Sequence, residues 1–210
     1  MNAAFRRVAI DARCGPCRAE ARRNGGVLPL GIPIRETVMT ISLSQASIPV
    51  FVRALRNLRH ILDKGAAHAR DRGVAPDSLL ELRVVDDMLP LSRQVQIACD
   101  MAKNGAARLA GQDPVPLPDD ETTMEQLYAR IDRSIELVEA VDAGRIDGSE
   151  GREIVLTTRV GELRFNGQDY LLQFVLPNLF FHITTTYALL RREGAPLGKT
   201  DFIAGPNAPT

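Results

Sequence analysis

The stretch that most constrains the fold is residues 169–193, DYLLQFVLPNLFFHITTTYALLRRE. Between Leu171 and Leu190 apolar residues occupy nearly every side of the helical wheel, which is typical of a helix surrounded by neighbours. Gln173, Pro177 and His182 interrupt the run, and inside a bilayer each would need a protein partner. The stretch therefore predicts the central helix of a helical bundle, not a membrane span.

Length, charge and cysteine content limit the classes of protein to consider. A chain of 210 residues favours one domain with a sizeable core. Lys plus Arg and Asp plus Glu number 26 each, so no overall field attracts nucleic acid or an anionic membrane. There are three cysteines and no apolar segment with a cleavage site. We therefore expect a cytoplasmic location, with neither nucleic acid nor a membrane as partner.

Residues 1–38 differ from the rest of the chain. They hold seven Arg and three acidic residues with little periodicity, and a regular pattern begins at Met39. We predict a disordered leader or a start placed too early, then a bundle over residues 39–205 and a tail over 206–210. Cys14-Gly15-Pro16-Cys17 resembles the thioredoxin motif, but no βαβ pattern follows it and no second CxxC would complete a zinc site. The role of this motif stays open.

From residue 44 the apolar positions repeat every three or four residues, which predicts helices. The third helix can begin with a capping box, either Thr122 with Glu125 or Thr123 with Gln126. A change to alternating residues predicts a small β-hairpin or extended insertion over 154–165. The tail should fold back and bury Phe202 and Ile203. The expected fold is all-α, with helices over about 44–73, 90–109, 122–144 and 168–193.

The same periodicity places the polar residues that could carry chemistry. His60 falls on the polar face of the first helix, and His68 falls at the edge of its buried face. In the second helix Gln94 flanks the inner stripe, while Gln96 faces away from it. Asp87 precedes that helix, where the helix dipole favours negative charge.

Three stretches resemble a known superfamily: MTISLSQASIPVFVRALRNL, LPLSRQVQIACDMAK and DYLLQFVLPNLFFHITTTYALLRREGAPLGKTDF. Together they look like the DinB/YfiT-like four-helix bundles, specifically an uncharacterised family within that superfamily. The resemblance spans about residues 39–205. It implies a bundle with an excursion before a histidine-bearing last helix, and it implies metal-dependent enzymes in which three histidines bind a divalent cation.

The superfamily's metal ligands are only partly present here. Its last helix often carries HxxxH; His182 matches the second position, but Asn178 stands at the first. The second helix has Gln94 or Gln96 near the place of its histidine. A three-histidine site is therefore not supported. A substitute set of His68, Asp87 and His182 could bind zinc, iron or nickel. Alternatively, His182 is a core histidine bonded to Asn178 or a threonine.

Two functions remain open from the sequence. The first is a non-catalytic bundle that binds a small ligand, forms a homodimer, or does both, since the last helix is apolar on all sides. Asn178 and Gln94 are candidates for its pocket. The alternative is a divalent-metal-dependent transferase or hydrolase that uses His182 with His68 and Asp87.

Overall fold

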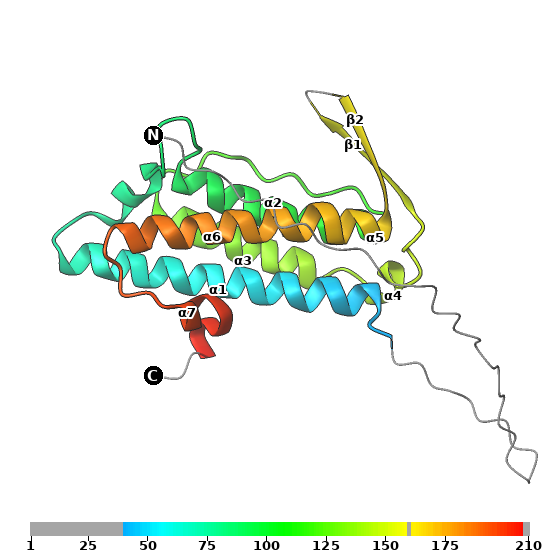
Figure 1. Cartoon of the computed structure of the whole chain (residues 1–210), viewed down its shortest axis with the longest axis horizontal. Helices are drawn as coiled ribbons and strands as arrows, with labels where there is room; N and C mark the ends of the chain where they lie inside the picture. The colour runs from blue at the N-terminus through cyan, green and yellow to red at the C-terminus, as the bar shows by residue number, and fades with distance from the viewer. Residues whose placement is uncertain (1–39, 159–160, 208–210) are drawn as a thin grey trace, which may run out of the picture. The chain divides into compact units, whose positions relative to one another are not determined.

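A computed structural model describes residues 40–158 and 161–207 of the chain (Figure 1). Within these ranges the fold consists of four long helices, several short helical segments and one two-stranded sheet. The expected all-α bundle with a hairpin between its third and fourth long helices is confirmed. The predicted leader, with Cys14 and Cys17, lies outside the described residues. No helix in the described ranges is long and apolar enough to cross a membrane.

The first long helix, α1, spans Leu43–Asp71. Ser42 and Gln45 form a capping box at its start, which satisfies two backbone donors that would otherwise lack partners. Phe51, Leu55 and Leu58 on its apolar face are fully buried. Gly73, with a φ of +69°, follows the C-terminal end of α1. A 3₁₀ segment, η1 (Pro76–Glu81), then places Leu79 and Leu80 in the core.

The second helix, α2, spans Leu91–Leu109 directly after Pro90. Small residues on its inner side allow the last helix to approach closely. At Gly105 an added Cβ would lie 2.9 Å from a side-chain carbon of Val175. The stripe of Ala98, Ala102 and Ala106 is fully buried. These small side chains explain why α2 can pack tightly against both α3 and α6.

The third helix, α3, spans Met124–Glu139 and begins with the capping box of Thr123 and Gln126, one of the two predicted pairs. The short α4 (Ala143–Ile146) follows it. Strands β1 (Glu153–Thr158) and β2 (Gly161–Asn166) form the antiparallel hairpin, with Ile154 opposite Phe165. Phe165 packs against Tyr170 and Phe174, which joins the hairpin to the last long helix.

The last long helix is built from three consecutive segments: α5 (Gly167–Asp169), the π-helical η2 (Tyr170–Val175) and α6 (Leu176–Arg192). Pro177 has no N–H to donate to the preceding turn, so a widened turn just before it is a physically reasonable adjustment. Figure 1 shows the combined helix lying along α2 and α1. It packs on α2 and α1, but it is not surrounded by neighbours as the sequence predicted, because Leu172, Phe180 and Phe181 are 48%, 39% and 55% exposed.

After Gly194 the chain turns back and forms α7 (Lys199–Ala204) and the single turn η3 (Gly205–Asn207). Both segments pack on α1 (Figure 1). The fold-back was predicted, but its burial was overestimated: Phe202 is only half-buried and Ile203 is 48% exposed. The reason is that both side chains border a cavity, described below, and not the closed core.

Candidate functional site

His182 lies in α6 and contacts Gln94 in α2. Its Nδ1 donates a hydrogen bond of 2.7 Å to Gln94 Oε1. Gln94 Nε2 in turn donates to the backbone oxygen of Leu89 at 3.0 Å, which fixes the orientation of the amide. Because an amide oxygen can only accept, the proton of a neutral His182 ring resides on Nδ1, and Nε2 carries the lone pair.

The electrostatic environment keeps this ring neutral. His182 and Gln94 are 9% and 2% exposed, so both groups are largely shielded from water. Burial lowers the pKa of His182 below its usual value, because desolvation disfavours the charged form of the ring. Nε2 of His182 has no hydrogen-bond partner among residues 40–158 and 161–207. The arrangement is that of an oriented, uncharged imidazole.

Asn178, at the first position of the expected HxxxH pair, makes no hydrogen bond to His182. Its Nδ2 donates to the backbone oxygen of Phe174 at 2.7 Å. Phe174 belongs to the π-helical turn before Pro177, and this bond satisfies one of the carbonyls there. The interpretation that His182 is a satisfied histidine holds for Nδ1, but the partner is Gln94 and not Asn178 or a threonine.

His68 and Asp87 lie in different surroundings from His182. Asp87 is exposed in the turn between η1 and α2. His68 packs near Gly194 and borders a cavity of about 120 Å³, where its buried Nε2 has no partner among the described residues. In the described ranges no three His, Cys, Asp or Glu side chains are close enough to share a metal ion. The structure therefore does not bring His68, Asp87 and His182 together as a ligand set.

The donors around His182 do not fit the three-histidine centre that the resemblance implies. They comprise one imidazole and the carboxamides of Gln94 and Asn178, both of which already bond to backbone oxygens. Protein zinc sites are formed by thiolates, imidazoles and carboxylates, and an uncharged amide is a poor replacement for these. The His182–Gln94 pair is better described as a hydrogen bond across the α2–α6 interface than as a metal centre.

The periodicity missed an ion cluster around the buried Arg130 of α3. The Arg130 side chain is 1% exposed and pairs with Asp100, Asp119 and Glu121 at 2.9 to 3.0 Å. Gln96 also bonds to Glu121 and is 3% exposed, so the loop that contains Glu121 covers this side of α2. The cluster connects α2 to this proline-rich loop of residues 111–121, which precedes α3. In the core beside it, burial raises the pKa of the Cys99 thiol to about 12, so this cysteine remains protonated.

His60, on the polar face of α1, contacts the C-terminal segment. Its Nε2 donates to the Asp201 carboxylate at 2.9 Å, and Lys64 donates to the same oxygen at 2.8 Å. His60 is therefore half-buried under α7 and not simply solvated. A helical wheel treats α1 alone, and only the return of the C-terminal segment shows that this polar face has a partner.

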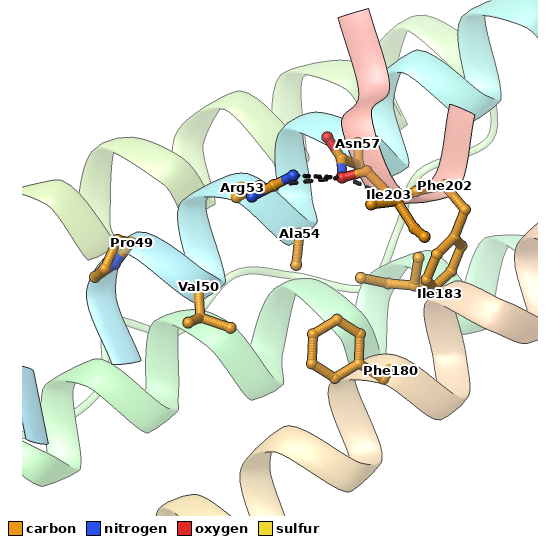
Figure 2. A pocket seen from close by; sticks show the side chains of 9 residues that line it. All are labelled: Pro49, Val50, Arg53, Ala54, Asn57, Phe180, Ile183, Phe202 and Ile203. Atoms are coloured by element: carbon orange, nitrogen blue, oxygen red, sulfur yellow. Dashed lines mark hydrogen bonds between the residues drawn. The ribbon is translucent and has the colours of Figure 1, made fainter. Parts of the chain in front are cut away.

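The same return of the chain creates a cavity of about 440 Å³ between α1, α6 and α7 (Figure 2). Its walls are mostly apolar, and Ala54 and Ile183 line its inner part. Arg53 and Asn57 of α1 are at its edge and donate to the backbone oxygen of Ile203 at 2.9 Å. The residues that line it are Pro49, Val50, Arg53, Ala54, Asn57, Phe180, Ile183, Phe202 and Ile203.

Comparisons with known proteins agree with this fold. The sequence model of a family described as "Domain of unknown function (DUF1993)" matches residues 43–203. The crystal structure of a DinB family member protein from Shewanella denitrificans is similar, with a TM-score of 0.71 and 35% sequence identity. That alignment covers 77% of this chain and 91% of the other. No curated protein matches this chain.

The family match extends over α1, α2, α3, the hairpin and α6, and it ends inside α7. It thus includes every element that forms the His182–Gln94 pair and the walls of the cavity. The chain belongs to the family of unknown function DUF1993, within the DinB-like helical bundles.

Proposed function

We propose that this protein binds a small, largely apolar molecule in the cavity between α1, α6 and α7. The observation that carries the proposal is the cavity itself, with a volume of about 440 Å³. Ligand pockets typically measure about 300 to 1,000 Å³ and are lined mainly by apolar side chains with a few polar groups at fixed positions. This cavity has that composition, because only Arg53 and Asn57 among its lining residues are polar.

The geometry of the polar groups also supports binding. Arg53 and Asn57 are both held by the backbone oxygen of Ile203, so their positions do not depend on a ligand. The inner wall is formed by Ala54 and Ile183, which belong to the buried faces of long helices. A cavity whose polar groups are already oriented loses little entropy on binding.

A cavity-filling variant tests this proposal. Ala54→Phe places a ring in the cavity, while Ala67→Phe adds the same ring at an exposed position of the same helix. Amide NMR shifts of the full-length protein, titrated with 1-octanol, should change around Ala54, Ile183 and Phe202 in the wild type and in Ala67→Phe. Ala54→Phe should abolish these changes. Absence of binding to the wild type, or equal binding to both variants, would refute the proposal.

A second candidate function is general-base catalysis at His182. It is favoured by the fixed tautomer, since the Gln94 contact leaves a lone pair on Nε2 of a neutral ring. The metal-dependent version with His68 and Asp87 gains no support from the positions of those residues. Hydrolysis of p-nitrophenyl acetate compared between the wild type and His182→Asn provides a test. Equal rates would argue against a reactive His182.

The homodimer expected from the sequence stays a prediction. Phe180 and Phe181 of α6 are 39% and 55% exposed, and an interface on α6 would have to cover them. Light scattering of the wild type and of Phe181→Ser would test it. A strict monomer in both samples would contradict the dimer.

A further inference from the structure

The cavity between α1, α6 and α7 is lined by one positively charged side chain and by no negatively charged one among the described residues. That side chain is Arg53. By contrast, the other basic groups that α1 presents nearby bond to carboxylates. Arg56 pairs with Glu139, and Lys64 and His60 both bond to Asp201. A positive charge at the rim of an apolar cavity therefore remains uncompensated.

The guanidinium of Arg53 is oriented and only partly used. Its Nε and Nη2 donate to the Ile203 backbone oxygen at 3.3 and 2.9 Å, as Figure 2 shows. Arg53 has no ion pair within the described ranges, whereas Arg56 and Arg59 of the same helix each have one. A guanidinium has five N–H donors in a planar fork. Three of these five donors therefore have no acceptor among the described residues and are available to a ligand.

The apolar wall begins directly beside this charge. Ala54 follows Arg53 in the chain, and Phe180, Ile183 and Phe202 face the same space from α6 and α7 (Figure 2). A ligand that fills the space would remove these apolar surfaces from water. If one end carried a negative charge, that end could reach Arg53 without entering the apolar part of the cavity.

We infer that the ligand of this cavity is an amphiphile with an apolar body and a single anionic group, such as a carboxylate, that binds Arg53. This inference rests on the proposed ligand-binding function and adds the chemical class of the ligand. Arg53 is the specificity-determining residue, because it distinguishes an anionic head group from a neutral or cationic one. Charge-assisted hydrogen bonds from guanidinium to carboxylate supply the discrimination.

The experiment compares three probes that share one alkyl chain: octanoate, 1-octanol and octylammonium. Calorimetric titration of the full-length wild type at neutral pH should rank octanoate first and octylammonium last, with octanoate about tenfold tighter than octanol. Arg53→Gln should reduce octanoate affinity to that of octanol and leave octanol affinity unchanged. Arg53→Lys should retain part of the preference, and Arg56→Gln, in which a paired arginine is lost, should retain all of it.

Each other outcome has a defined meaning. Equal affinity for octanoate and octanol, or a preference for octylammonium, would overturn the anionic assignment and leave the ligand-binding proposal intact. A loss of affinity for both octanol and octanoate in Arg53→Gln would show that Arg53 only positions α7, which also overturns the assignment. If none of the probes binds the wild type, both the assignment and the proposed function fail. Circular dichroism of each variant confirms that it is folded.

Discussion

Gln94 Oε1 accepts a hydrogen bond of 2.7 Å from Nδ1 of His182, and this bond links α2 to α6 inside the bundle. The amide cannot turn freely, because its nitrogen donates to Leu89. Gln94, which is far from His182 in the sequence, thus fixes the tautomer of the His182 ring. The chain retains an oriented histidine at the place where the resemblance implies a metal ligand, with an amide where another histidine would stand.

The first prediction concerns the pH dependence of stability. Burial lowers the pKa of His182 in the folded state, so the unfolded chain binds the proton more readily. The free energy of unfolding should therefore fall as pH drops below about 6.5, the ordinary pKa of histidine, and continue to fall towards the lower folded value. His182→Asn, which can still donate to Gln94, should lose this part of the slope. Urea unfolding across that pH range measures it, and an unchanged slope in the variant would contradict the account.

The second prediction concerns Gln94. Gln94→Leu removes the acceptor of His182 Nδ1 and the donor to the Leu89 backbone oxygen, which leaves the Nδ1–H of the buried His182 ring without a partner. We expect a loss of about 1–3 kcal/mol in the free energy of unfolding. Gln94→Glu should instead raise the pKa of His182, since a carboxylate beside the ring stabilises its charged form. NMR titration of the ring measures the latter, and an unchanged pKa in Gln94→Glu would argue against the contact.

The sequence predicted local features well and tertiary partners poorly. The capping box of Thr123 and Gln126 was predictable, because all its atoms lie within one helical turn. The buried face of α1 was equally predictable, because its apolar residues repeat every three or four positions. By contrast, the contacts of His60 with Asp201 and of Gln96 with Glu121 join segments that periodicity treats separately. The cavity could not be predicted either, because it exists only where α7 returns to α1.

The third prediction concerns Asp201, which anchors α7. Its carboxylate accepts from Lys64, His60 and the backbone N–H of Gly198. Burial opposes ionisation, but these hydrogen bonds outweigh it and hold the pKa of Asp201 well below its usual range. The resulting stabilisation is present above about pH 4 and is lost as pH falls through the lowered pKa. Docking of α7 should therefore persist at mildly acidic pH.

Asp201→Asn should weaken this anchor at neutral pH by about 1–2 kcal/mol and remove its dependence on acid. Amide hydrogen exchange in residues 199–204 measures how often α7 detaches. We also expect weaker binding in the cavity, since Phe202 and Ile203 line it. Unchanged exchange in α7 would show that the carboxylate contacts contribute nothing to its docking.

The fourth prediction concerns the ion cluster around the buried Arg130. Replacing this residue with leucine leaves Asp100, Asp119 and Glu121 without their shared cation. Asp100 and Asp119 are partly exposed and keep Lys103 and Arg93 as partners, so we expect a loss of about 1–3 kcal/mol in the free energy of unfolding. Arg133→Leu is the matched control, because Arg133 lies on the same helix in an exposed pair with Glu136. It should change the free energy of unfolding by less than about 1 kcal/mol. Similar losses in both variants would contradict the assigned role of the cluster.

The most direct test of the central claim uses tryptophan fluorescence, since the chain contains no tryptophan. Phe180→Trp places a reporter in the cavity wall, and Phe181→Trp places one at the neighbouring exposed position outside it. On addition of octanoate, emission of the Phe180→Trp protein should shift to shorter wavelength and saturate, while the Phe181→Trp protein should not respond. Equal responses from both reporters, or none from Phe180→Trp, would contradict binding in the cavity.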